Sequence, residues 1–439
     1  MNEDNFYVTI LSLVPLNRTI VSDGSDDVVS KLLHFMPDGK ILEYPSGTHS
    51  SNWYIPPFWK VESAFLKDLD SNEVLVSSEE SVLFVAPYSK SCNQTLSKSE
   101  LISITLTSPE NPETFKYQHR LAYDPTRNLN EVSISLPDKL LTNLSPDHMY
   151  NLVIRTTYRS GTMKVFEARH SGTTESSIYL LSHYCHSGQL NDGLGGVYVM
   201  GRVMERLKKS FKTPKMNYVW LSFPETIGSS VYLSDHEDAI VNGFASIFCE
   251  MPGAVSDVRV TMSRRANSYI DRILEYVLTT SKIPFTAVAF REGWGNDEMV
   301  FDSPIVGIPS VSVDRAPFAS YHLSSDDVSK FNLDRANQII ELVFRLLSLI
   351  ERDYIPEPQF TVPPQLSRFG LYQDWTINRE GYKSVMTLLD SLDGETSVLD
   401  IALRNRIEVE FTFNFFEKLK LENLIIEHPL NAQYARKSF

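Results

Sequence analysis

The sequence is poor in features that mark secreted and membrane proteins. It has only three cysteines in 439 residues and no paired disulfide framework, which favours a reducing compartment. No apolar run approaches the roughly 20 residues that a membrane-spanning helix needs. The first residues, Met1–Asn5, lack the basic region of a secretory signal peptide. We therefore expect a cytoplasmic protein without a membrane partner.

Positive charge is also scarce. The chain has 41 Lys and Arg against 55 Asp and Glu, a net charge of −14 at pH 7, which argues against a broad electrostatic grip on nucleic acid. A hydrophobic content of 42% with 22% charged residues is typical of a globular chain with a buried core. At this length we expect two or three structural units and no nucleic-acid partner.

The apolar pattern divides the chain into three units and a linker. Helical spacing near the N-terminus and strand–helix alternation in the middle predict an α/β domain from residues 1–58 and 170–352, with a mixed, mainly parallel sheet flanked by helices. Short strand-like runs predict an inserted β-rich domain over 59–169. A proline-stiffened linker, 353–364, precedes residues 365–439, whose helix–helix–helix–strand order is typical of a winged helix. Acidic residues outnumber basic ones there, which argues against a face that binds nucleic-acid phosphates. We therefore expect a packing or dimerisation module.

Two histidines and an aspartate follow the predicted strand 178–182. His183 and His186 come directly after it, and Asp192 precedes a helical pattern. Ligands bind at the carboxyl edge of open α/β sheets, and imidazole with carboxylate is the usual ligand set of catalytic zinc. The alternative is a pair of polar loop histidines before a helix that Asn191 or Asp192 caps. On this stretch alone both interpretations stay open.

Acid and imidazole groups recur at other predicted strand ends. Glu225 follows the next apolar strand, and Glu250 follows the one after it. Asp297 and Glu298 lie in a glycine-rich loop, and His322 precedes a helix. Each alone has an ordinary explanation as a cap, a solvated loop or a buried hydrogen bond. Because parallel strands end at the same edge of a sheet, the recurrence favours one shared site.

Three arginines are candidate substrate-binding residues. Arg18 lies in a loop rich in hydrogen-bonding side chains and is a candidate clamp for a substrate carboxylate. Arg264 and Arg265 are candidates for stabilising an oxyanion or a carboxylate. For all three, a structural role is the alternative.

An ordered set of motifs resembles one family. The aminopeptidase-like proteins of largely unknown function carry, in this order, Ser182-His-x-Cys-His186, Asn191-Asp192, Pro224-Glu-Thr-Ile-Gly-Ser229, Ser263-Arg-Arg265, Asn296-Asp-Glu298 and Tyr321-His322. Pro15–Ile20 and Pro45–Thr48 with Trp53 also look like N-terminal motifs of that family, so the resemblance spans essentially the whole chain. It implies a zinc-exopeptidase-type α/β domain with an inserted β domain and a C-terminal winged helix, distantly similar to the di-zinc aminopeptidases.

The resemblance also implies roles for individual residues. The implied metal ligands are His183 or His186, together with Asp192, Glu250 and His322, and the choice between the two histidines stays open. Glu225 would match the general base. Cys185 stands where the di-zinc pattern has an aspartate behind the first histidine, and Thr226 stands where it has a ligand glutamate. One or two zinc ions are therefore expected.

These residue types fit a hydrolytic mechanism. Zinc lowers the pKa of water to about 7 and polarises a carbonyl group. Glu225 would take the proton of that water and return it to the leaving amine, and Asp297 or Glu298 would receive a substrate ammonium. The predicted function is a zinc-dependent aminopeptidase or related amidohydrolase that acts on a small peptide or an aminoacyl conjugate.

Other classes of function stay open. Besides Thr226, the chain has Ser187, Gly193 and Gly195 where nearer relatives are expected to have proline, asparagine and serine. These departures suit a non-catalytic binding or regulatory protein on the same fold, and the fold also suits a metal-dependent acyl-transfer or cyclising enzyme. The inserted module is a candidate lid or dimer contact over the metal edge. A homo-oligomer through that module or the C-terminal domain stays open.

Overall fold

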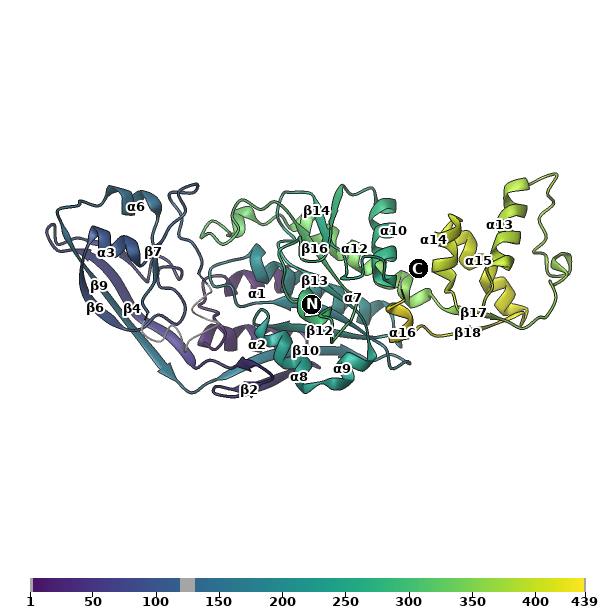
Figure 1. The fold of residues 1–439 in the computed structure, drawn as a ribbon, viewed down its shortest axis with the longest axis horizontal. Helices are drawn as coiled ribbons and strands as arrows, with labels where there is room; N and C mark the ends of the chain where they lie inside the picture. The colour runs from purple at the N-terminus through teal and green to yellow at the C-terminus, as the bar shows by residue number, and fades with distance from the viewer. Residues whose placement is uncertain (1–2, 119–130, 438–439) are drawn as a thin grey trace.

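An eight-stranded mixed sheet forms the centre of the molecule. The computed structural model describes residues 3–118 and 131–437. The strands of the sheet are β1 (Lys40–Pro45), β10 (Thr162–His170), β11 (Ser177–His183), β12 (Asn217–Phe223), β13 (Gly243–Cys249), β14 (Val258–Thr261), β15 (Phe285–Val288) and β16 (Ser310–Arg315). Their order is β1-β10-β12-β11-β13-β16-β14-β15, and β12, β11, β13 and β16 are mutually parallel (Figure 1). The predicted α/β fold with a mixed sheet is confirmed.

Helices cover both faces of this sheet. One face packs against α1 (Glu3–Leu13), α2 (Asp23–Phe35), α7 (Gly196–Ser210), α10 (Tyr269–Ser281) and α12 (Leu333–Arg352). The other face packs against α8 (Ile227–Asp235), α9 (Glu237–Asn242) and α11 (Glu298–Phe301). In β11, Ile178 and Leu180 point to the first core and Tyr179 and Leu181 to the second, since successive strand residues face opposite sides. No helix in the described part of the chain has the length and apolar composition of a membrane span.

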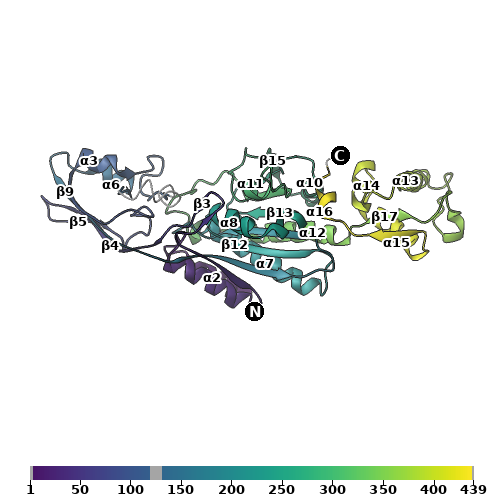
Figure 2. The same cartoon turned by 60° about the horizontal axis from the view of Figure 1, so that its bottom comes forward.

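A second, four-stranded antiparallel sheet lies at one end of the molecule (Figures 1 and 2). It consists of β4 (Phe58–Asp68), β5 (Val74–Ser77), β6 (Cys92–Ser97) and β9 (Met149–Arg159), in the order β5-β4-β9-β6. The smaller elements nearby are α3 (Lys98–Ser103), β7 (Thr105–Leu106), β8 (Ile134–Ser135) and α6 (Asp138–Asn143). The short strands β2 (His49–Ser50) and β3 (Trp53–Tyr54) pair with each other and contact the helix α8 of the α/β body. These strands fall within or next to the range predicted for the insertion.

The strand β10 does not belong to this second sheet. The apolar pattern predicts an insertion over 59–169 that contains all of β10 but its last residue, yet β10 pairs with β1 and β12 in the central sheet. Its buried side chains Met163, Val165 and Phe166 enter the two cores of the α/β body. An alternating apolar pattern predicts a strand but not the sheet that the strand joins. By strand pairing, the inserted sheet therefore ends with β9.

The C-terminal part lies at the opposite end (Figure 2) and contains α13 (Arg379–Asp390), α14 (Val398–Asn405), α15 (Val409–Leu421) and β18 (Ile425–His428). The last helix, α16 (Ala432–Ala435), lies against the α/β body and contacts β13 and α10. The strand β17 (Ile355–Pro358) falls inside the predicted linker and pairs with β18. Arg272 of α10 binds both carboxylate oxygens of Asp400 at 2.7 and 2.8 Å, which ties this part to the α/β body. The order of three helices and a strand is as expected, and the winged-helix assignment stays a prediction.

Candidate metal centre

The loop after β11 presents the central groups of the site. His183 is the last residue of that strand, and Asp192 follows on an irregular turn that leads into α7. Gly193 adopts φ +98°, and a Cβ atom there would lie 3.1 Å from the ring of His183. Because only glycine accepts this conformation readily, Gly193 suits the close approach of the turn to the histidine. This departure from the expected asparagine therefore has a structural reason.

A first set of ligand atoms comes from His183, Asp192 and Glu250. Nε2 of His183 lies 3.3 Å from Oδ1 of Asp192 and 3.7 Å from Oε2 of Glu250. All three side chains are buried, and their ligand atoms lie within 4.8 Å of one another. They come from the carboxyl ends of β11 and β13 and from the turn before α7, which is the edge that the sequence predicted.

A second set comes from His186, Asp192 and His322, whose ligand atoms also lie within 4.8 Å of one another. Asp192 Oδ1 is 3.9 Å from His186 Nδ1, and its Oδ2 is 3.1 Å from His322 Nε2. The rings of the two histidines stack with centroids 5.3 Å apart. The sequence left His183 and His186 as alternatives, and the structure places them in different sets that share Asp192.

Glu225 lies beside both histidines of the strand-end loop. Its Oε2 is 3.5 Å from Nε2 of His186, and it forms a third group with His183 and His186. Its side chain is 15% exposed, whereas the side chains of Asp192 and Glu250 are at most 2% exposed. The backbone N–H of Glu225 donates to Cys185 Sγ at 3.2 Å. Glu225 is thus more exposed than the carboxylates of the first ligand set, and its role as a general base stays a prediction.

Asp297 lies behind His183. Its Oδ2 is 3.6 Å from Nδ1 of His183, and its Oδ1 accepts hydrogen bonds from Thr226 N at 2.8 Å and Ser229 Oγ at 2.5 Å. A carboxylate behind a metal-binding histidine fixes the tautomer and orientation of the ring. Asp297 thus lies on the Nδ1 side of His183, where a carboxylate can orient the ring. Glu298 accepts from Asn296 N, and burial raises the pKa of Glu298 to about 7. The substrate contact of these two carboxylates stays a prediction.

Arg18 is fully buried below the histidine loop. Its five guanidinium N–H groups donate to the carbonyls of Leu13, Val14, Tyr184, His186 and Gln189. All donors are therefore engaged with backbone, and none is left for the carboxylate of a substrate. Arg18 instead fixes the loop that carries His186, because three of the five carbonyls belong to that loop.

Arg264 and Arg265 make contacts away from the ligand sets. The Arg264 Nε donates to the carbonyl of Asp302 at 3.0 Å, and its backbone N donates to the Asp302 carboxylate at 2.7 Å. Arg265 is exposed and donates to the carbonyl of Arg436. These contacts fit the structural alternative, and a role of either arginine toward a substrate stays a prediction.

The electrostatics of the ligand sets suit a bound cation. Burial, reinforced by the charge of Asp192, raises the pKa of Glu250 well above its usual range. Although burial alone would raise it, the imidazoles of His186, His183 and His322 lower the pKa of Asp192 well below its usual value. The buried Asp192 Oδ2 faces an imidazole nitrogen, Nε2 of His322, at 3.1 Å. Clustered imidazole nitrogens and carboxylate oxygens are zinc ligands, and a cation would offset the repulsion between the carboxylates, so these residues fit zinc.

Two groups near the site had no signal in the sequence. Tyr117, from the segment after β7, packs its ring 4.8 Å from His186 and 5.2 Å from His322, and its backbone N donates to the His322 carbonyl at 2.8 Å. Asp326 accepts from the backbone N of Asn191 and of Asp192, each at 2.9 Å, and so holds the turn of the shared ligand. Tyr117 lies outside any periodic pattern, and an aspartate before a helix is ordinarily a cap.

Comparisons with known proteins identify the family of this chain and proteins of similar fold. The sequence model of the family described as "Domain of unknown function (DUF4910)" matches residues 7–353. A Clostridium acetobutylicum protein called a putative polysaccharide biosynthesis protein with aminopeptidase-like domain is 28% identical over 413 residues, 92% of this chain and 91% of that protein. A putative peptidase from the same organism has a similar structure, with TM-score 0.81, 24% identity and coverage of 97% and 96%. A zinc aminopeptidase from Bacillus subtilis has TM-score 0.57 at 14% identity, over 79% of this chain and 95% of that one.

Proposed function

This chain belongs to the aminopeptidase-like DUF4910 family, and we propose that it is a zinc-dependent aminopeptidase or related amidohydrolase. The substrate would be a small peptide or an aminoacyl conjugate with a free N-terminus. The observation that carries the proposal is the position of Asp192, which lies within ion-pair distance of three histidines and belongs to two sets of ligand atoms. The fold of the chain supports the same conclusion, because a zinc aminopeptidase of Bacillus subtilis has a similar fold.

The two ligand sets support two zinc ions. His183, Asp192 and Glu250 would hold one ion, and His186, Asp192 and His322 the other. In the di-zinc pattern a glutamate at position 226 would complete the second set, but this chain has Thr226 there. We propose that His186 takes the place of that carboxylate, because its Nδ1 lies 3.9 Å from Asp192 Oδ1 and its ring stacks on the ring of His322.

The residues around the ligand sets would perform the proton transfers. Bound zinc supplies a water of lowered pKa and polarises the substrate carbonyl. Glu225 is the base that takes the proton, because it is partly exposed and its carboxylate adjoins His186. The same carboxyl group then protonates the leaving amine. Asp297 holds the His183 ring from behind, and Arg18 holds the loop that carries His186.

Glu225→Gln is the direct test of this mechanism. The substitution keeps the shape of the side chain and removes the base, so we expect kcat to fall at least about 100-fold with the zinc content unchanged. The assay is release of the N-terminal amino acid from a panel of dipeptides and aminoacyl amides. Glu275→Gln, at an exposed position of α10, is the matched control and should keep full activity. Full activity of the Glu225→Gln protein would reject the proposed role and favour a non-catalytic protein on this fold.

A further inference from the structure

His322, a ligand of the proposed second set, lies on a loop whose conformation needs support. The loop consists of residues 316–327 and runs between β16 and the short helix η2 (Val328–Lys330). His322 has φ +57°, a left-handed conformation that residues other than glycine seldom adopt. Such a conformation persists only where the surroundings fix it, so the contacts of this loop decide where the imidazole lies.

A segment of the inserted domain, the bridging segment of residues 115–117, supplies such contacts. It runs antiparallel to the His322 loop. Tyr117 N donates to the His322 carbonyl at 2.8 Å, and Ser324 N donates to the Phe115 carbonyl at the same distance. Phe115 N donates in turn to Ser324 Oγ at 3.0 Å. These three hydrogen bonds fasten the His322 loop to the inserted domain.

The bridging segment is itself anchored within the inserted domain. Lys116 N donates to Ser135 Oγ at 2.7 Å, and the amide of Gln118 donates to the carbonyl of Ile134 at 3.0 Å. Both acceptors belong to β8 and are buried. The position of the His322 loop therefore depends on the fold of the inserted domain.

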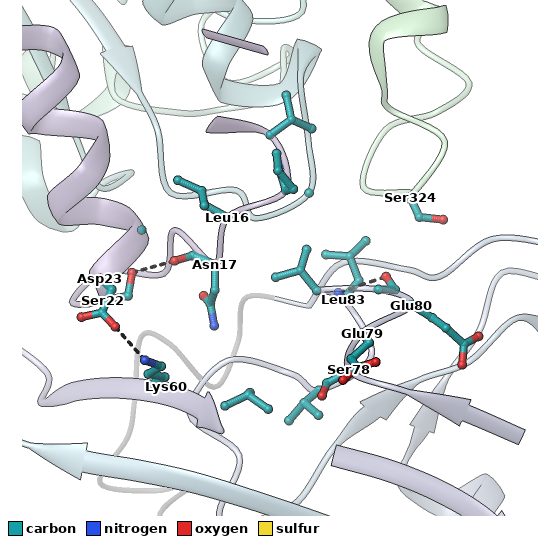
Figure 3. Close-up of a pocket in the computed structure, with 18 of the residues that line it drawn as sticks. Leu16, Asn17, Ser22, Asp23, Lys60, Ser78, Glu79, Glu80, Leu83 and Ser324 are labelled. Carbon is teal, nitrogen blue, oxygen red and sulfur yellow. Dashed lines mark hydrogen bonds and ion pairs between the residues drawn. The ribbon is translucent and has the colours of Figure 1, made fainter. Parts of the chain in front are cut away.

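A cavity of about 690 Å³ lies beside this contact, between the N-terminal loop and the turn after β5 (Figure 3). Figure 3 shows Ser324 on the loop of the α/β body and Leu83 on the inserted domain, and both residues line this space. Because the two domains do not pack against each other across the cavity, the bridging segment carries a larger share of their contact here.

Tyr117 is the residue of the bridging segment that reaches the metal ligands. It is buried, and its ring centroid lies 4.8 Å from that of His186 and 5.2 Å from that of His322. The ring thus packs on both histidines of the second set. Packing of this kind locks the rotamers of side chains in a site, so the Tyr117 ring restricts the orientation of both imidazoles.

We propose that the inserted domain positions the second ligand set, with Tyr117 as the positioning residue for His186 and His322. The inference rests on the proposed zinc-dependent function and deepens it, since it names what holds the ligands of the second ion. The first set comes from the carboxyl ends of β11 and β13 and from the turn before α7, all in the α/β body. Loss of the Tyr117 ring therefore weakens the second zinc ion and leaves the first in place.

Zinc affinity tests the proposal without any assay of hydrolysis. The metal-free full chain is titrated with zinc in competition with a chromophoric chelator, as the wild type, Tyr117→Phe and Tyr117→Leu. The phenylalanine variant keeps the ring and should bind both ions within about twofold of the wild type. The leucine variant fills much of the space without a ring, so we expect the second ion to bind at least about tenfold more weakly and the first within about twofold.

Tyr150→Leu is the matched control. Tyr150 is buried near the start of β9 and donates to the carbonyl of Ser145 at 2.8 Å, within the inserted domain. The control loses a buried ring from the same domain, and a melting curve confirms that each variant is folded. It should bind both ions as the wild type does. Equal zinc affinity of Tyr117→Leu and the wild type would overturn the proposal, and so would loss of the second ion in Tyr150→Leu or in Tyr117→Phe.

Hydrogen–deuterium exchange tests the same coupling without a substitution. If the bridging segment positions the ligands, bound zinc must in turn hold the bridging segment, because coupling between two sites is reciprocal. Exchange over residues 112–118 should slow at least about threefold when zinc is added, whereas exchange in β9 should not change. Exchange over 112–118 that zinc does not affect would overturn the proposal.

This proposal and the hydrolytic function fail separately. A wild type that takes up two zinc ions, with the second weakened in Tyr117→Leu, supports the positioning role even if it hydrolyses no peptide, and the hydrolytic function is then rejected. A wild type that hydrolyses peptides but takes up only one ion keeps that function and overturns this proposal.

Discussion

Arg18 offers the sharpest test of how the site is held together. Replacing it with methionine keeps an unbranched apolar stem and removes all five donors that reach the carbonyls of Leu13, Val14, Tyr184, His186 and Gln189. A buried carbonyl that loses its partner destabilises the fold by at least about 1 kcal/mol, so the five together amount to about 5 kcal/mol.

Removal of the buried charge of Arg18 offsets part of this destabilisation. Burial lowers the pKa of Arg18 from 12.5 to about 10, and that difference corresponds to about 3 kcal/mol. The remaining destabilisation of Arg18→Met is at least about 2 kcal/mol. In a domain of this size the melting temperature should then fall by at least about 5 °C.

Differential scanning calorimetry measures this effect, and Arg265→Met is the matched control. Arg265 is exposed and gives one hydrogen bond to a carbonyl, so its replacement should change the melting temperature by less than about 2 °C. We also expect weaker zinc binding by folded Arg18→Met, because the loop that carries His186 loses its anchor. Equal melting temperatures of the two variants would refute the role that we assign to Arg18.

Two further predictions concern the turn of the metal centre and the C-terminal junction. Gly193→Ala should lower stability by about 1–3 kcal/mol and weaken zinc binding, because φ is +98° and the new Cβ would lie 3.1 Å from His183; calorimetry and zinc titration check this. Burial raises the pKa of Asp353 to about 6, so its contribution to stability is full below pH 3.8 and is lost as the pH rises through 6. Urea unfolding at pH 4 and pH 7 measures this effect. From pH 4 to pH 7, the free energy of unfolding of Asp353→Asn should rise relative to that of the wild type by up to about 3 kcal/mol. A difference between the two proteins that does not change with pH would contradict the prediction.

Much of the site follows from the sequence because of a simple geometric rule. Parallel strands end at one edge of a sheet, so residues directly after β11, β12 and β13 must gather there. His183, Glu225 and Glu250 do lie together for this reason. The sequence could not separate His183 from His186, because a loop of two residues between them allows either to face the site. Their assignment to different ligand sets needs coordinates.

Contacts between distant segments lie beyond what a local pattern can predict. Asp297 belongs to a glycine-rich loop, and nothing in its spacing shows that it lies behind His183. The sequence allows Arg18 to be either a substrate clamp or a structural residue, and its guanidinium is buried by a loop about 170 residues away in the chain. The strand β10 has the pattern of the inserted strands but pairs in the central sheet. In each case, tertiary packing decides between roles that the local sequence allows equally.

Zinc content is the measurement that tests the central claim most directly, namely that Asp192 joins two ligand sets. Protein purified without chelators is analysed by inductively coupled plasma mass spectrometry as the wild type and as His186→Ala, Asp192→Ala and His34→Ala. His34 is exposed on α2 and serves as the control. We predict about two zinc ions per chain in the wild type and the control, about one in His186→Ala, and almost none in Asp192→Ala. A wild-type protein without zinc, or an unchanged content in Asp192→Ala, would contradict the claim.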